Sequence, residues 1–296
     1  MNDLLVRDGY RRAHALTRTH AKSFHFASWA LGGARRRGAL ALYAFCRRLD
    51  DLVDEPSAPP AALVPRLEAA RALVRAVCGP GAGAVPAPFD VAETAALRDT
   101  IRRFAIPEAP LQDLIDGVAM DLTVHRYATA AALDRYCYLV AGTVGLMMAP
   151  LLGYRDPAAL APAAALGHAM QLTNILRDVG EDLARDRIYL PQADLAAAGL
   201  SEADLRAGRV DARFRACMQA QVARARALYA EARRGIPLLD GARSRLTVRL
   251  MAAVYGDILR AIEAQDYDVF RRRAVVSGGR KLVLAAAALG LREAPA

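Results

Sequence analysis

Cysteines are few in this sequence, and long uncharged apolar runs are lacking. The 296 residues include four cysteines, at positions 46, 78, 137 and 217, without a CxxC pair. This spacing argues against a structural zinc site or a disulfide framework and fits a reducing compartment. No run reaches the roughly 18 uncharged apolar residues of a transmembrane helix, and the N-terminal MNDLLVRDGYRRAH lacks the apolar core of a secretory signal. We therefore expect a cytoplasmic protein whose contact with a membrane is at most peripheral.

Signals for β-strands are also sparse. Aromatic residues make up 6% of the chain, alternating Val, Ile and Thr are rare, and alanine and leucine dominate. This composition predicts a mostly helical protein, and no repeat of about 34 or 40 residues indicates a solenoid. The segments beside the loose linker at 79–90 are too short to hold separate cores, so we expect a single all-α domain over residues 1–296.

Clusters of proline and glycine separate the expected helices. The second helix is expected to follow an interruption at GGARRRG (32–38) and to end near EPSAPP (55–60). The others are expected at about 2–30, 61–78, 91–104, 108–122, 129–151, 157–184, 202–207, 211–234, 241–265 and 279–290.

The charge of the chain is strongly positive. A net charge of +9, carried mostly by arginine, indicates an anionic partner such as nucleic acid, a membrane surface or a phosphorylated substrate. A GC-rich genome also favours arginine, so the charge alone does not decide between these partners.

Four acidic residues nevertheless crowd into residues 46–55, CRRLDDLVDE. Asp50 and Asp54 are four residues apart and share one helix face, with Arg47 one turn before Asp50. Paired carboxylates suit Mg²⁺, whose remaining ligands are typically waters and substrate phosphates. A solvated acidic helix end explains this motif equally well when it is taken alone.

A second row of oxygen ligands lies in QLTNILRDVGEDLARDRIYLP, residues 171–191. Asn174, Asp178 and Asp182 follow one another at intervals of four residues and combine an amide oxygen with two carboxylates. Surface helices usually offset an acid with a basic residue four positions on, but here the next position holds another acid. Two such rows facing one cavity would bind magnesium ions and, through them, a diphosphate.

Magnesium ions opposite arginines suit the ionisation of an allylic diphosphate. Metal ions and arginine donors stabilise the charge on the departing pyrophosphate, and the carbocation left behind needs a dry apolar pocket. The segment YCYLVAGTVGLMMAPLLG (136–153) could form a wall of that pocket, although close helix packing explains its small residues and methionines more simply. These residues are Ala141, Gly142, Gly145, Met147 and Met148.

From AKSFHFASWAL (21–31) to YDVFRRRAVVSGGRKL (267–282), the sequence resembles the squalene/phytoene synthase family of head-to-head prenyltransferases. YAFCRRLDDLVDE is similar to the first aspartate-rich motif of that family, and QLTNILRDVGEDLARDRIYLP to the second. The segments YCYLVAGTVGLMMAPLLG and YDVFRRRAVV most resemble bacterial phytoene synthases. The resemblance implies the isoprenoid synthase fold, an all-α bundle around a central cavity with the two aspartate-rich helices facing each other across its mouth.

The resemblance also implies roles for residues at matching positions. Mg²⁺, with Mn²⁺ as a substitute, would be bound by Asp50, Asp54, Asn174, Asp178 and Asp182. Diphosphate would be contacted by Lys22, Ser23, Arg47 and Arg177, and by Arg272 or Arg273. The pocket near the reacting carbons would be lined by Tyr43, Tyr136, Gln171, Tyr189 and Tyr255. Of these, Tyr136 and Tyr189 would steady cationic intermediates or assist proton transfer, and together with Arg177 they form the expected catalytic set.

The implied reaction condenses two geranylgeranyl diphosphates to phytoene through prephytoene diphosphate. It needs no hydride donor, and the chain has no GxGxxG fingerprint, so we expect no nicotinamide cofactor. Two alternatives remain open: a family member that uses C15 substrates to make squalene, presqualene diphosphate, hydroxysqualene or diapophytoene, and a non-catalytic assembly homologue. A nucleic-acid binder would explain the charge but not the acid rows, so we expect no nucleic-acid partner. Because the product would be insoluble in water, we expect peripheral contact with the inner membrane face, aided by basic C-terminal residues.

Overall fold

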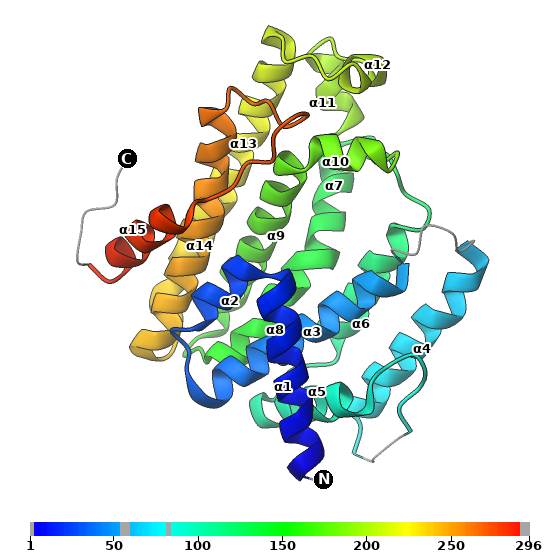
Figure 1. Cartoon of the computed structure of the whole chain (residues 1–296), viewed down its shortest axis with the longest axis vertical. Coiled ribbons are helices and arrows are strands. Elements are labelled where there is room, and N and C mark those ends of the chain that lie inside the picture. Colours follow the sequence, from blue (N-terminus) through cyan, green and yellow to red (C-terminus); the bar gives the residue numbers. More distant parts are fainter. Residues whose placement is uncertain (1–2, 54–59, 81–83, 291–296) are drawn as a thin grey trace.

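The structure is a computed structural model that describes residues 3–53, 60–80 and 84–290. Within these ranges the regular structure is helical, and the β contacts are two isolated bridges, Arg126–Ile188 and Tyr154–Leu239. The predicted all-α class is therefore confirmed. Figure 1 shows the helices arranged as a bundle, with α9, α13 and α14 running side by side in its upper part and α3 to α6 in its lower part.

The α-helices have the following bounds: α1 Asp3–His20, α2 Lys22–Ser28, α3 Gly33–Val53, α4 Pro60–Cys78, α5 Val91–Phe104, α6 Ala109–Met120, α7 Ala130–Cys137, α8 Thr143–Leu152, α9 Leu160–Arg177, α10 Val179–Ala184, α11 Gln192–Ala197, α12 Glu202–Arg206, α13 Ala212–Arg234, α14 Gly241–Ala264 and α15 Gly278–Ala288.

Helix α5 coincides with the range predicted for it, because both of its ends carry local signals. The Asp90 carboxylate accepts a hydrogen bond from the backbone N–H of Glu93 at 2.8 Å, which caps the first turn. At the other end Ala105 takes a left-handed conformation, with φ of 50°, and the chain leaves the helix there.

Two expectations near the N-terminus were wrong. The helix expected over 2–30 is divided at Ala21, whose φ of −131° and ψ of 61° are not helical. The GGARRRG segment, expected as an interruption, contains the start of α3 at Gly33, so its three arginines lie in the first turn of that helix.

Two longer helices are also irregular. A π-helical turn at Tyr138–Gly142 joins α7 to α8 within the segment expected as one regular helix, and such turns occur frequently at functional sites. The helix expected over 157–184 is interrupted at Asp178, with φ of −105° and ψ of 15°. Short α11 was not expected.

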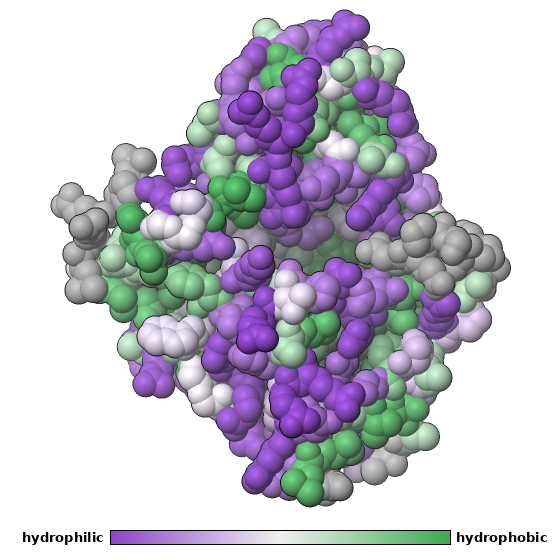
Figure 2. Space-filling view, viewed as in Figure 1, coloured by the Kyte–Doolittle hydropathy of each residue, from purple (hydrophilic) through white to green (hydrophobic). Residues whose placement is uncertain are grey.

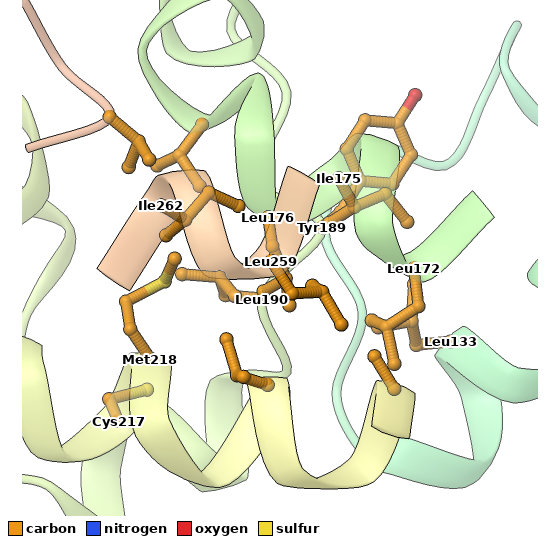
Figure 3. Packing of buried hydrophobic residues seen from close by; sticks show 14 of the residues in the cluster. Leu133, Leu172, Ile175, Leu176, Tyr189, Leu190, Cys217, Met218, Leu259 and Ile262 are labelled. Carbon is orange, nitrogen blue, oxygen red and sulfur yellow. The ribbon is translucent and has the colours of Figure 1, made fainter. Parts of the chain in front are cut away.

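The core consists of two main apolar clusters. One joins α7, α9, α13 and α14 with the segment 188–190, and Figure 3 shows Leu176 close to Leu259 and Leu172 close to Leu133 within it. The other joins α3, α4, α5, α6 and α8 around residues such as Leu49 and Leu111.

The continuous helical stretch Ala130–Leu152 is long and apolar enough to cross a membrane by length and composition. Core helices pass the same test, and this stretch contains the fully buried Leu133, Met147 and Leu151. Among the described helices it alone meets these criteria, as a single core helix of a globular protein can.

Candidate active site

An apolar cavity of about 260 Å³ lies where α2, α3, α8, α9 and α14 meet. The structure places four of the predicted site residues on its wall: Tyr43, Gln171, Asn174 and Tyr255. Tyr43 also stacks on Phe24, with ring centroids 5.6 Å apart, and burial raises the pKa of Tyr43 to about 12. Figure 2 shows a recess near the centre of the molecule with hydrophobic side chains at its floor and hydrophilic side chains around it.

The cavity extends along α9. Asn174 lies near the C-terminal end of this helix and Ala163 near its N-terminal end, and both line the cavity. The eleven residue steps from Ala163 to Asn174 correspond to about 16 Å along the helix axis. The cavity is therefore elongated, with the acid row at one end.

The first acid row can be followed only in part. On α3, Tyr43 and Cys46 line the cavity, and Asp50 lies one turn beyond Cys46 with its side chain exposed. Burial raises the pKa of the Cys46 thiol, and the nearby Asp50 carboxylate raises it further. Asp50 is thus next to the cavity on the same helix as Tyr43. Asp54 lies outside the described residues.

The second acid row keeps its helical register across the interruption at Asp178. The N–H of Asp178 donates to the carbonyl of Asn174 at 2.9 Å, and the N–H of Asp182 donates to the carbonyl of Asp178 at 2.9 Å. The spacing of four residues predicted from the sequence is therefore maintained from α9 into α10.

Two guanidinium groups hold the Asp178 carboxylate. The Nε of Arg177 donates to it at 2.8 Å, and the Nε and Nη2 of Arg273 donate to its two oxygens at 2.9 and 3.1 Å. Burial alone would raise the pKa of Asp178, but these hydrogen bonds lower it below its usual value. Asp182 shows the opposite: burial, with the neighbouring charge of Asp178, raises its pKa to about 7.

The other basic residues predicted to contact diphosphate occupy different surroundings. Arg47 pairs with Asp51 at 2.6 Å on the same helix. Arg273 reaches Asp178, whereas the backbone carbonyl of Arg272 accepts a hydrogen bond from Gln265. Lys22 is exposed at the start of α2, beside the half-buried Ser23.

Tyr136 and Tyr189 do not line the cavity but meet in a separate buried cluster. Their hydroxyls are 3.4 Å apart and approach the carboxylate of Asp121 at 3.1 and 3.2 Å, respectively. Tyr127 packs against both rings, with centroids 5.3 and 5.7 Å away. Burial, with the charge of Asp121, raises the pKa of both hydroxyls, which are therefore neutral at physiological pH.

Asp121 was not identified from the sequence. It is the residue that ends α6, where the negative end of the helix dipole disfavours a carboxylate. An acid in that position is a local signal for a specific partner. Here the partners are the hydroxyls of two tyrosines that lie 15 and 68 positions further along the chain.

Two glycines in the cavity wall serve close helix packing. A Cβ at Gly145 would lie 2.0 Å from the carbonyl oxygen of Ala163, and a Cβ at Gly167 would lie 2.0 Å from that of Ala141. The segment 136–153 and helix α9 therefore touch along their backbones. Close helix packing, the simpler of the two explanations given above, accounts for the small residues of this segment.

The donor atoms of the second row fit a hard divalent cation. Amide and carboxylate oxygens are ligands that Mg²⁺ accepts, with the remainder supplied by water and phosphate. The pKa of Asp182 is raised by burial and by the charge of Asp178, and a bound cation would offset both effects. Within the described ranges no three His, Cys, Asp or Glu side chains form a ready-made metal site, so substrate oxygens would have to complete the coordination.

Comparison with known proteins gives concordant results. The model of the family described as squalene/phytoene synthase matches residues 17–280. The chain is 41% identical over 286 residues to phytoene synthase 2, chloroplastic, of Solanum lycopersicum, covering 94% of this chain and 89% of that protein. It is 42% identical over 294 residues to phytoene synthase 1, chloroplastic, of Zea mays, covering 96% and 69%.

Solved structures give the same picture. A dehydrosqualene synthase in complex with ligand superposes with a TM-score of 0.87 at 31% identity, covering 96% of each chain. A squalene synthase from Alicyclobacillus acidocaldarius superposes with a TM-score of 0.79 at 31% identity, covering 88% of this chain and 95% of that one.

Proposed function

The chain belongs to the squalene/phytoene synthase family, and we propose that it condenses two geranylgeranyl diphosphates head to head, forming phytoene through prephytoene diphosphate. It is a prenyltransferase with the isoprenoid synthase fold. The observation that carries the substrate class is the acid row of α9 and α10 at one end of an elongated apolar cavity. Such a site accommodates a molecule with a charged head and a long hydrocarbon tail.

Divalent metal serves diphosphate binding in this family, and here Asp50, Asn174, Asp178 and Asp182 would hold Mg²⁺. Bound there, the metal would neutralise the diphosphate and make it a better leaving group. The sequence assigns Asp54 to the same set. The position of Asp182 one turn after Asp178, with a pKa raised by burial and by the charge of Asp178, supports this assignment.

The side chains of the protein would perform the remaining tasks. Arg177 and Arg273 already converge on Asp178 and can transfer N–H donors to diphosphate oxygens. The cavity wall excludes water from the allylic cation, with Met148, Met170 and Met251 as adaptable contacts. The hydroxyl of Tyr189 lies near Asp182, and the hydroxyl of Tyr136 is 3.4 Å from that of Tyr189. Both hydroxyls are neutral, so they can stabilise positive charge without forming a covalent bond to it.

Purified protein incubated with Mg²⁺ and geranylgeranyl diphosphate is expected to release phytoene and pyrophosphate. Asp178→Asn should abolish turnover, because the amide is a poorer metal ligand. Asp186→Asn is a matched control, since Asp186 is an exposed aspartate of the following turn that pairs with Arg126 and Arg206. Consumption of only the C15 diphosphate would instead identify a squalene- or diapophytoene-forming enzyme.

The assembly homologue remains the alternative of a different class. It predicts that Asp50→Ala or Asp178→Ala retains its full effect in cells, whereas an enzyme loses it. We also propose peripheral membrane contact for this chain in the cytoplasm, because a C40 hydrocarbon leaves the cavity for a lipid phase more readily than for water.

A further inference from the structure

A second hollow, open and polar, lies between α1, the start of α3 and α5. It encloses about 900 Å³ and is lined by five arginines and two carboxylates. The arginines are Arg7, Arg11, Arg36, Arg37 and Arg103, and the carboxylates are Asp3 and Asp99. We call this hollow the basic groove. Figure 2 shows hydrophilic side chains gathered over α1 on the face where the groove opens.

The basic groove is separated from the apolar cavity by the short segment 28–33. Ser28 and Leu31 line the cavity, whereas Trp29, Gly32 and Gly33 line the groove. The two hollows therefore lie on opposite sides of one stretch of chain. A ligand of the groove would sit beside the wall of the candidate active site.

Two histidines and an arginine are packed together beside this groove. The Nε2 atoms of His14 and His25 are 3.2 Å apart, and the Nη2 of Arg36 lies 3.3 Å from the same atom of His25. The Nε of Arg36 is buried and has no hydrogen-bond partner. Among the described residues no carboxylate pairs with Arg36, so this guanidinium carries an uncompensated charge, which is costly.

The start of α3 adds to this positive potential. The helix has 21 residues, and its first turn contains Arg36 and Arg37 with no acidic residue. Free N–H groups and the helix dipole already make this end positive. The charges of the arginines are therefore unfavourable here, because they have the same sign as the end of the dipole. One anion in the groove would interact favourably both with the positive end of the helix dipole and with the unpartnered Nε of Arg36.

Two of the basic residues near the C-terminus differ from Arg36 in this respect. Arg280 is held by the buried carboxylate of Asp257 at 2.8 Å, and Arg273 by Asp178. Their charges are compensated within the protein. Arg36 in the basic groove has no such partner among the described residues, although Arg7 and Arg103 in the same groove pair with Asp3 and Asp99.

Apolar side chains at the same place indicate which source of phosphate fits. Trp29 lines the groove with 75% of its surface exposed, and Leu4 on α1 is 74% exposed. Tryptophan favours the boundary between lipid and water, and arginine pairs with phosphate oxygens in two parallel hydrogen bonds. A soluble phosphate would use the arginines but not the tryptophan.

We propose that the basic groove docks the protein on the phosphate headgroups of an anionic phospholipid bilayer, with Trp29 inserted at the lipid boundary. This inference deepens the proposed membrane contact and rests on that part of the proposed function. In this orientation the 28–33 segment, which is a wall of the apolar cavity, faces the lipid.

The test is sedimentation of the full chain with vesicles of phosphatidylcholine, with and without phosphatidylglycerol. Binding is expected only to the anionic vesicles and should weaken with added salt. Arg7→Gln/Arg37→Gln should weaken it by about fivefold per arginine, and Trp29→Ala should weaken it as well. Arg7, Arg37 and Trp29 are exposed, so these variants should fold. The control Arg226→Gln/Arg234→Gln removes two exposed arginines of α13 and should bind like the parent.

Equal binding by the groove and control variants would overturn the proposal. It would also be overturned if inorganic phosphate or diphosphate bound in an Arg36-dependent manner while vesicles did not, since the groove would then serve a soluble anion. Turnover measured in detergent distinguishes failure of the docking surface from failure of the proposed phytoene synthase activity. Groove variants that lose vesicle binding but keep turnover support the docking surface. If the protein showed groove-dependent vesicle binding but no turnover, the docking surface would be supported and the proposed enzymatic function would be wrong.

Discussion

Replacing Arg273 with glutamine is expected to tighten the binding of a divalent cation and to weaken the capture of diphosphate. Arg273 donates two hydrogen bonds to Asp178, a proposed metal ligand, while Arg177 holds the same carboxylate. With both arginines in place few lone pairs of Asp178 are free, so one of them must move before a cation binds. Arg273 is the more mobile candidate, since its side chain is 50% exposed and that of Arg177 is 16% exposed.

The size of the effect follows from this exposure. A charged hydrogen-bonded pair contributes about 1.5–3 kcal/mol when buried, but solvent around Arg273 reduces this to about 1 kcal/mol. Removing the competitor should therefore lower the Kd for Mn²⁺ about fivefold in the absence of substrate, measured by electron paramagnetic resonance. The KM for geranylgeranyl diphosphate should rise, because a donor to its phosphate oxygens is lost.

The neighbouring Arg271→Gln is the matched control, because Arg271 is 72% exposed and pairs only loosely with Asp268, at 3.5 Å. It should change neither constant. An Arg273→Gln variant whose Mn²⁺ affinity is unchanged or weaker would refute the idea that this arginine competes with metal for Asp178.

Three further predictions test the surroundings of the site. Asp121→Asn should lower the pKa of the two tyrosine hydroxyls that it contacts, seen by ultraviolet titration, and should reduce turnover; unchanged tyrosine titration would contradict the assigned contacts. Gly145→Ala should destabilise the protein by about 1–3 kcal/mol in urea unfolding, because the added Cβ meets a backbone oxygen at 2.0 Å, whereas Gly256→Ala, with open space around it, should not. Ala163→Phe, at the end of the cavity remote from the acids, should reduce use of the C20 diphosphate more than use of the C15 one, measured by competition; an equal loss for both would show that this end does not hold the tail.

The fold class and the second acid row could be predicted because their signals are local. Helix ends such as Asp90 are capped by residues a few positions away, and Asn174, Asp178 and Asp182 share a face by helical spacing alone. Even the interruption at Asp178 leaves that spacing intact, since the hydrogen bonds to the fourth residue continue through it.

The contacts that the sequence did not reveal join residues far apart in the chain. The choice of Arg273 over Arg272, and the meeting of Tyr136 and Tyr189 at Asp121, depend on how helices pack. The tyrosines were expected on the cavity wall, and nothing in their own segments indicates the separate cluster that they form. A sequence pattern predicts which residues share a helix face, but it does not predict which face of another helix packs against them.

Opposite charge imbalances at the two ends of the cavity give a bound substrate its direction. At one end burial, with the neighbouring charge of Asp178, raises the pKa of Asp182 to about 7, a cost that a bound metal would reduce. At the other end Leu31 lines the cavity. Trp29, two residues earlier in the chain, lines the basic groove, in which arginines outnumber carboxylates. A diphosphate held at the acid row would therefore place its hydrocarbon tail toward the face proposed to rest on lipid. That arrangement keeps the charged head in water and brings the apolar tail within one segment of the bilayer, which favours the transfer of a hydrocarbon product to the membrane.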